Sequence, residues 1–179
     1  MRKLIGTYLL FLMVCTMVIS QTPNSWEFSS DFIAGQRDRA VGFSINNLGY
    51  VSCGLDTADA VHNDLWEFDP ASSTWSQKAN LPGSARRNAV AFVIDQFAYV
   101  GTGVDHAEAP MGNILNDFWK YDPSTNGWIQ ISNFPGGNVY FATAFANSEK
   151  GYVCGGKIGP DTYITVSYTH LRAHETEAY

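Results

Sequence analysis

The amino-acid sequence predicts an all-β fold that is built by repetition. Residues 63–82 return as residues 116–135, and both copies contain Asn-Asp, a Trp, an aromatic residue, Asp-Pro, a second Trp and a closing Pro. Trp66 and Trp119 are 53 positions apart (119 − 66). Because a fixed long period marks a repeat architecture, each copy is expected to form one supersecondary unit.

The repeat also extends upstream of this stretch. Residues 37–54 match residues 86–103 with an offset of 49 (86 − 37), and residues 139–156 match the second copy with an offset of 53 (139 − 86). The offset changes because the second copy has four more residues before its Asn-Asp pair, (116 − 103) − (63 − 54). Since loops tolerate insertions, that position is expected to be a loop.

The first half of each repeat is expected to be a β-hairpin. In the first copy, residues 40–45 and 49–54 are apolar runs, and Asn46-Asn47-Leu48 between them has the composition of a tight turn. The glycine that ends the second run, Gly54, marks a place where the backbone bends or approaches another segment closely.

The second half of each repeat is expected to supply the third and fourth strands. Residues 65–69 alternate aromatic with other side chains, which is typical of a half-buried strand. Asp69-Pro70 opens a turn, because Pro presets φ at the second position and Asp can accept a backbone N–H. Residues 74–78 follow as the fourth strand, and no part of the repeats has a convincing helical period.

The N-terminal part of the chain falls in register with a fourth strand. Trp26 lies 49 positions before Trp75 (75 − 26), and Phe32 lies 49 positions before Leu81 (81 − 32). A chain whose first segment corresponds to the last strand of a repeat is expected to add that strand to a sheet formed far along the chain. Such pairing closes a ring of sheets and leaves no open sheet edge.

Residues 1–20 are expected to be a secretory signal peptide. Arg2 and Lys3 precede a mostly apolar run over residues 4–19, and Ser20 suits a cleavage site. The run is shorter than the roughly 20 residues of a membrane span. The protein is therefore expected to be secreted or in the cell envelope, without membrane insertion after cleavage; an uncleaved anchor and lipid attachment at Cys15 are the alternatives.

The charge of the chain disfavours polyanionic partners. Its formal net charge is −6, and removal of two basic residues with the leader makes it −8 (−6 − 2). Because no basic stripe is present to neutralise phosphates, neither nucleic acid nor an anionic membrane surface is expected as a partner.

Two cysteines remain after the leader, Cys53 and Cys154. They occupy neighbouring positions of equivalent strands, so their side chains should point to opposite faces. Both are expected to be unpaired, small buried residues.

The combined motifs of residues 37–156 resemble the kelch repeat. These motifs are an apolar first strand after Arg, a Tyr-Val-x-x-Gly second strand, a Tyr/Phe-Asp-Pro turn and a Trp soon after. The resemblance implies a kelch-type β-propeller in which each repeat is one four-stranded blade: blade A is residues 37–83, blade B residues 86–136 and half blade C residues 139–163. Only Gly155-Gly156 keeps the double glycine of the family.

The resemblance also implies that the propeller of residues 21–163 is incomplete. It has two and a half blades and a closing strand, whereas closed propellers have about four to eight blades. The chain is therefore expected to be an N-terminal fragment of a longer protein. Residues 164–179 leave the repeat register, and their SYTHLRAHET segment resembles translated sequencing-adapter sequence. A non-native tail is expected; a native strand or short helix is the alternative.

Four arginines at the starts of the first strands are the candidate ligand-binding residues. They could grip a carboxylate bidentately, as in sialic or uronic acid. Alternatively, they bond to Asp-Pro turns or carboxylates between blades, which their repetition favours. The four are Arg37, Arg39, Arg86 and Arg87.

Other polar and aromatic groups are expected to be structural. His170 and His174 have the spacing of a two-His metal site on a helix, but no third ligand is fixed nearby. The loop histidines are expected to be solvated, the loop aspartates to cap turns rather than bind calcium, and the tryptophans to pack between blades. These groups are His62 and His106; Asp56, Asp64, Asp105, Asp117 and Asp161; and Trp26, Trp66, Trp75, Trp119 and Trp128.

The sequence thus predicts a binding or scaffold module that recognises a protein or glycan through its loops. The alternative is part of a sugar enzyme, since kelch-like propellers include sialic acid mutarotases and copper-dependent galactose oxidases. No catalytic residue, cofactor or metal ligand is assigned, and the repeats contain no histidine pair for copper.

Overall fold

The computed structural model describes residues 24–106, 112–164 and 167–172. The expected signal peptide lies outside these residues. All regular elements of the described chain are β-strands, which confirms the all-β prediction. The described residues contain no helix long and apolar enough to cross a membrane.

The first repeat folds into an antiparallel four-stranded sheet, blade A. Its strand order is β2-β3-β5-β6, with β2 at Val41–Ile45, β3 at Leu48–Ser52, β5 at Leu65–Asp69 and β6 at Thr74–Lys78. The turns are those expected: Asn46 and Asn47 both adopt positive φ between β2 and β3, and Asp69 Oδ1 accepts the N–H of Ala71 at 2.8 Å.

The second repeat forms blade B with the same order. Its strands are β7 (Val90–Ile94), β8 (Phe97–Gly101), β9 (Phe118–Asp122) and β10 (Gly127–Ile131). Trp66 pairs with Val51 in blade A, and Trp119 pairs with Val100 in blade B, so the repeat in the sequence is a repeat of strand register.

The third sheet, blade C, includes a strand from the segment expected to be a non-native tail, for which a native strand was the alternative. It has the order β11 (Thr143–Ala146), β12 (Lys150–Cys154) and β13 (Ser167–Arg172), and β13 pairs antiparallel with β12. The backbone of the supposed tail therefore takes the position of a third strand, because β12 offers it a free edge. His170 lies in this strand and not in a helix. The helical spacing considered for a His170–His174 metal site is therefore wrong for His170. The foreign origin of the tail stays a prediction.

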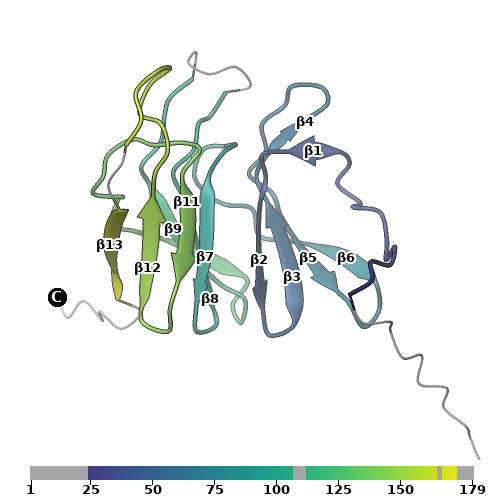
Figure 1. Cartoon of the computed structure of the whole chain (residues 1–179). Helices are drawn as coiled ribbons and strands as arrows, with labels where there is room; N and C mark the ends of the chain where they lie inside the picture. Colours follow the sequence, from purple (N-terminus) through teal and green to yellow (C-terminus); the bar gives the residue numbers. More distant parts are fainter. Residues whose placement is uncertain (1–23, 107–111, 165–166, 173–179) are drawn as a thin grey trace, which may run out of the picture.

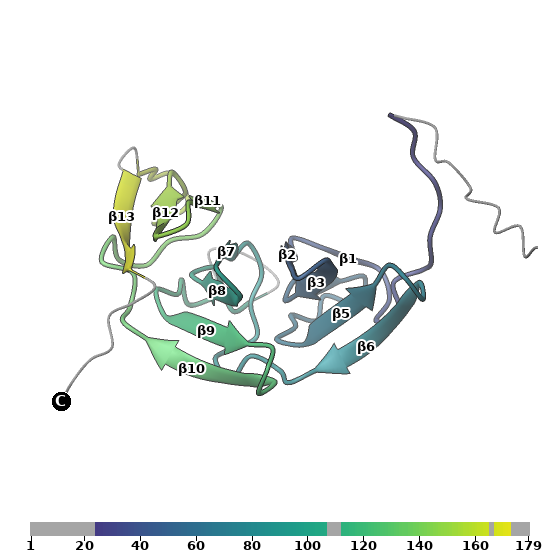
Figure 2. The same ribbon diagram turned by 90° about the horizontal axis from the view of Figure 1, so that it is seen from below.

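The three sheets stand side by side in an arc, with the first strands of the blades innermost (Figures 1 and 2). Strand β7 contacts both β2 and β11, while β6 and β10 lie on the outer edge. This is the arrangement of an incomplete β-propeller. A fourth, two-stranded sheet of β1 (Arg37–Asp38) and β4 (Leu55–Asp56) lies at the upper end in Figure 1.

The cores lie between neighbouring blades. Val41, Cys53, Leu81 and Val100 pack together between blades A and B, against the rings of the blade B tryptophans. Between blades B and C, Phe92 fits against Gly151 so closely that a Cβ there would overlap its ring.

The N-terminal segment has the predicted register but is not a strand. Phe32 packs on Trp66 and Trp75, with ring centroids 6.3 and 4.8 Å apart, as Leu81 packs beside the corresponding pair of blade B. Residues 25–32 nevertheless form no strand and pair with no strand of the described chain. Trp26 is 101% exposed, so it does not pack between blades here.

Both cysteines are free, as predicted. Cys53 is fully buried and Cys154 only half-buried. Burial raises the pKa of the Cys53 thiol to about 11, which leaves it protonated at neutral pH.

Candidate functional site

The segments that lead into the first strands meet at one end of the arc, near its axis. The N–H of Asn88 donates to the carbonyl of Arg39 at 3.0 Å, and the N–H of Phe141 donates to the carbonyl of Asn88 at 3.2 Å. These three residues hold the same repeat position in blades A, B and C, and all have positive φ, between 54° and 56°. We call residues 38–39, 87–88 and 140–141 the axial site.

Two of the four candidate arginines are occupied inside the blades. Arg86 forms a bidentate ion pair with Asp117, with Nη1–Oδ1 and Nη2–Oδ2 distances of 2.7 Å, and its side chain is fully buried. Arg37 binds Asp64 in the same way, at 2.6 and 3.0 Å. In each case the partner is the Asp of the Asn-Asp pair in the same blade. The alternative interpretation, in which the arginines bond to Asp-Pro turns or to carboxylates between blades, does not hold for these two arginines.

A tryptophan completes each of these clusters. The indole N–H of Trp119 donates to Asp117 Oδ2 at 2.6 Å, and that of Trp66 donates to Asp64 Oδ2 at 2.8 Å. Burial alone would raise the pKa of both carboxyls, but the hydrogen bonds from arginine and tryptophan outweigh it and hold each pKa below its usual value. These clusters join the three segments of each blade.

The other two arginines belong to the axial site. Arg87 is only 3% exposed, and its Nε donates to the carbonyl of His106 at 2.6 Å. Burial lowers its pKa, and the like charge of Arg39 lowers it further, so the two guanidinium groups lie within electrostatic reach. Within the described part of the chain, no carboxylate forms an ion pair with Arg87.

Three axial residues were missed from the sequence. Asn88 is 7% exposed, and its buried Nδ2 lacks a hydrogen-bond partner among the described residues. Tyr140 is buried at the repeat position of Arg87, and Phe141 is 54% exposed at the position of Arg39. The alignment of the three repeats is the signal that could have found them.

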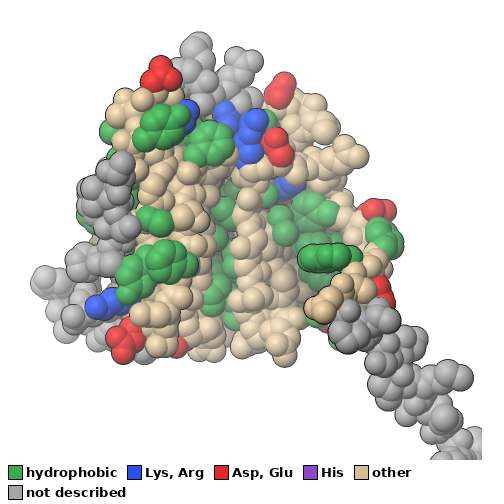
Figure 3. Space-filling model, viewed as in Figure 1, with side chains coloured by type: hydrophobic (Ala, Val, Ile, Leu, Met, Phe, Trp, Pro, Cys, Tyr) green, Lys and Arg blue, Asp and Glu red, His purple; other side chains and the backbone are tan. Residues whose placement is uncertain are grey.

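An acidic group and a hollow adjoin Arg39. Asp38 Oδ2 lies 3.6 Å from Arg39 Nε, and both residues line a cavity of about 510 Å³ with Gln36, Arg37 and four residues of the loop that spans residues 55–59. Figure 3 shows basic side chains beside an acidic one near the upper ends of the first strands. Paired guanidinium groups, an amide donor and an exposed ring suit a ligand with both a carboxylate and a flat apolar face.

Asp56, His62 and Asp105 bond within the loops in which they lie, unlike Asp64 and Asp117, which bind the blade arginines. Asp56 accepts the N–H groups of Ala58 and Ala60 at 2.8 and 2.9 Å and lies 2.9 Å from His62 Nε2. Asp105 accepts both the backbone and side-chain N–H of Asn113. Among the residues with described placement, no three His, Cys, Asp or Glu side chains converge on one point.

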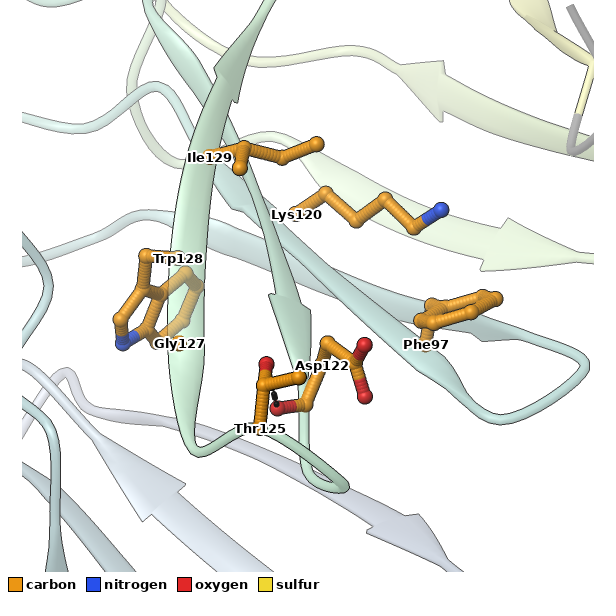
Figure 4. Close-up of a pocket in the computed structure, with 7 residues that line it drawn as sticks. All are labelled: Phe97, Lys120, Asp122, Thr125, Gly127, Trp128 and Ile129. Atoms are coloured by element: carbon orange, nitrogen blue, oxygen red, sulfur yellow. Dashed lines mark hydrogen bonds between the residues drawn. The ribbon is translucent and has the colours of Figure 1, made fainter. Parts of the chain in front are cut away.

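A second hollow of about 230 Å³ lies on the outer part of blade B (Figure 4). Lys120 Nζ lies 3.6 Å from the centroid of the Phe97 ring, and Trp128 and Ile129 line the wall. The hollow is at the opposite end of the blade from the arginines.

The comparisons with known proteins support the fold. No protein-family model and no curated protein matches the sequence. Among solved structures, YjhT is similar, with a TM-score of 0.69 and 18% sequence identity over 84% of this chain and 56% of the YjhT chain. The chain thus spans about half the length of that propeller, and at this identity the similarity shows the fold alone.

Proposed function

We propose that the protein is a binding module whose axial site takes a sugar that bears a carboxylate. The observation that supports this proposal is Arg87, a nearly buried cation that has no carboxylate partner in the described chain and lies close to the second cation Arg39. Two like charges held near each other are unfavourable alone, and an anion between them relieves the repulsion.

Binding assays with the purified protein test this proposal. N-acetylneuraminic acid and glucuronic acid should bind, whereas glucose should not, and Arg87→Ala should weaken binding by about 10- to 100-fold, since hydrogen bonds to charged groups contribute about 1.5–3 kcal/mol. Arg87→Lys should restore only part of the affinity, because Lys lacks the bidentate geometry.

The matched control is Lys120→Ala, which removes a cation at the opposite end of blade B and should leave sugar binding unchanged. Equal binding of neutral and acidic sugars, or binding that survives loss of both Arg39 and Arg87 in a folded variant, contradicts the proposal.

A sugar enzyme of the mutarotase type is a second candidate, supported by Asp38. The Asp38 carboxylate lies 3.6 Å from Arg39 Nε, where it could exchange a proton with a sugar whose own carboxylate is bound by the arginines. NMR exchange between sialic acid anomers measures this activity. Asp38→Asn should abolish the exchange while sialic acid still binds; a protein that binds sialic acid without faster exchange is a binding module only.

A further inference from the structure

The axial site changes its chemistry from blade to blade. The two positions that lead into the first strand are Asp38-Arg39 in blade A, Arg87-Asn88 in blade B and Tyr140-Phe141 in blade C. Blades A and B therefore supply charged groups and an amide, whereas blade C supplies two aromatic rings. A site with cations on one side and rings on the other suits a ligand that has both an acidic group and an apolar face.

Phe141 is an unusual residue for its backbone conformation. Its φ is 56°, in the left-handed region, where a bulky side chain is disfavoured and asparagine is favoured. Blade B has Asn88 at this position, with a φ of 55°. The hydrogen bond from the N–H of Phe141 to the carbonyl of Asn88 needs only the backbone. The fold therefore does not require an aromatic side chain here, and such an outlier points to a functional role.

The neighbouring residue supports the ring of Phe141. Tyr140 is 3% exposed and lies beside Phe141, with ring centroids 5.2 Å apart and the ring planes at 40°. The hydroxyl of Tyr140 donates to the carbonyl of Gly159 at 3.4 Å, which ties this ring to the upper loop of blade C. Because Phe141 itself is 54% exposed, one ring is buried as a support and the other presents an accessible face that is already in place for a ligand.

The exposure of Phe141 belongs to the axial position and not to the outer face of blade C. At the same position of blade A, the following blade contacts the backbone, since the N–H of Asn88 donates to the carbonyl of Arg39. The Arg39 side chain is still 37% exposed with blade B in place. A long side chain at this position thus reaches past the next sheet, and we expect a further sheet beside blade C to leave the Phe141 ring accessible in the same way.

The aromatic pair is also close to the cations. Burial lowers the pKa of Arg87, the charge of Arg39 lowers it further and the Tyr140 phenol opposes this shift, so these side chains lie within electrostatic reach of one another. A small ligand whose carboxylate binds the arginines would therefore extend toward the rings of blade C.

We propose that Phe141 selects among acids at the axial site by stacking on the apolar face of a pyranose ring whose carboxylate binds Arg39 and Arg87. This role rests on the proposed function, and it narrows the ligand class from acidic sugars in general to those with a closed ring. Open-chain sugar acids offer the same carboxylate but no flat face, so they should bind through the arginines alone.

Calorimetric titration of the purified protein with two sugar acids tests this role. Methyl glucuronoside has a closed ring and gluconate is an open chain, and the closed ring should bind about 3- to 10-fold more tightly, as expected for one aromatic stacking contact. Phe141→Asn should bind both acids equally, with its affinity for gluconate unchanged, whereas Phe141→Tyr should keep the preference. Since blade B has Asn at this position, Phe141→Asn should remain folded, which thermal unfolding checks.

The matched control is Ile129→Asn, which replaces an exposed apolar residue on the outer strand of blade B and should keep the preference for the closed ring. A preference that persists in Phe141→Asn, or equal binding of the two acids by the unchanged protein, overturns the role of Phe141 while the arginine site stands. Binding of neither acid overturns the proposed function and this role with it.

Discussion

Adjacent arginines in this chain have opposite surroundings. Arg86 is directed into blade B, where Asp117 neutralises it, while the Nε of Arg87 donates to the backbone carbonyl of His106. The difference follows from strand alternation, which sends neighbouring side chains to opposite sides. One arginine thus stabilises the blade, whereas the next forms no ion pair within the described part of the chain.

Loss of the Asp117 carboxylate should strongly destabilise blade B. Asp117→Asn leaves the fully buried Arg86 without its counter-ion, and such a change costs about 3–5 kcal/mol of unfolding free energy. Urea denaturation followed by tryptophan fluorescence measures it. Asp122→Asn, in the exposed turn between β9 and β10, is the control and should cost about 1 kcal/mol or less.

The same carboxyls should make the protein sensitive to acid. The pKa values of Asp64 and Asp117 are lower in the folded protein than in the unfolded chain, where they are about 3.9. Their stabilisation is therefore complete above that value and is lost as the pH falls through the folded pKa.

Thermal unfolding between pH 7 and pH 3 tests this expectation. The midpoint should change little down to about pH 5 and then fall below pH 4. The fall should be smaller in Asp117→Asn, which has one titrating group fewer. A midpoint that rises on acidification would show that these carboxyls are not paired in the folded state.

The end of each second strand turns through two successive residues with positive φ. In blade B these are Thr102 (61°) and Gly103 (96°), and in blade C they are Gly155 (66°) and Gly156 (100°). The first position accepts a side chain, since Thr occupies it in blade B. The second does not, because a Cβ on Gly103 would lie 2.7 Å from the carbonyl oxygen of Arg87.

Alanine substitutions should distinguish the two positions of this corner. Gly103→Ala should lower the unfolding free energy by about 2 kcal/mol or more, because a Cβ is unfavourable in the left-handed backbone conformation and would also clash with the Arg87 carbonyl oxygen. Gly155→Ala meets no atom within 4 Å and should cost about 1 kcal/mol. Denaturant titration of both variants tests the order, and equal losses would contradict it.

The strands of blades A and B could be predicted from the sequence because strand period, turn residues and repeat register all agree there. The expected third strand over residues 65–69 coincides with β5. The N-terminal strand failed, because a strand needs a partner edge that its own sequence does not contain. β13 was expected only as the alternative to a non-native tail, because its segment has no repeat motif and its pairing depends on the edge of β12.

The axial site could be predicted only in part. The sequence placed four arginines at one end of the blades but could not say which face each would take. Asn88 and Phe141 carry no motif of their own, and only the hydrogen bonds between blades bring them beside Arg39. Repetition identifies what is shared by the blades, whereas a binding site depends on the positions at which they differ.

Among the described strands, each blade contacts only its neighbours along the arc, so stability should be transmitted from one sheet to the next. Gly151 offers a direct test, because it forms the contact between blades B and C without a role in blade A. Gly151→Leu would force Phe92 out of its place and open the junction between these two blades.

Hydrogen exchange of the backbone amides should show where the effect of Gly151→Leu ends. We expect protection to fall in β11 and β12, to fall partly in β7 and to remain unchanged in β5 and β6, since blade A keeps its packing on blade B. Gly49→Ala is the matched control: it changes the same repeat position on an open face, blade B has Ala98 there, and exchange should stay unchanged. Equal loss of protection in all three blades would mean that the arc unfolds as one cooperative unit, and the coupling between blades would then be far stronger than neighbour contacts imply.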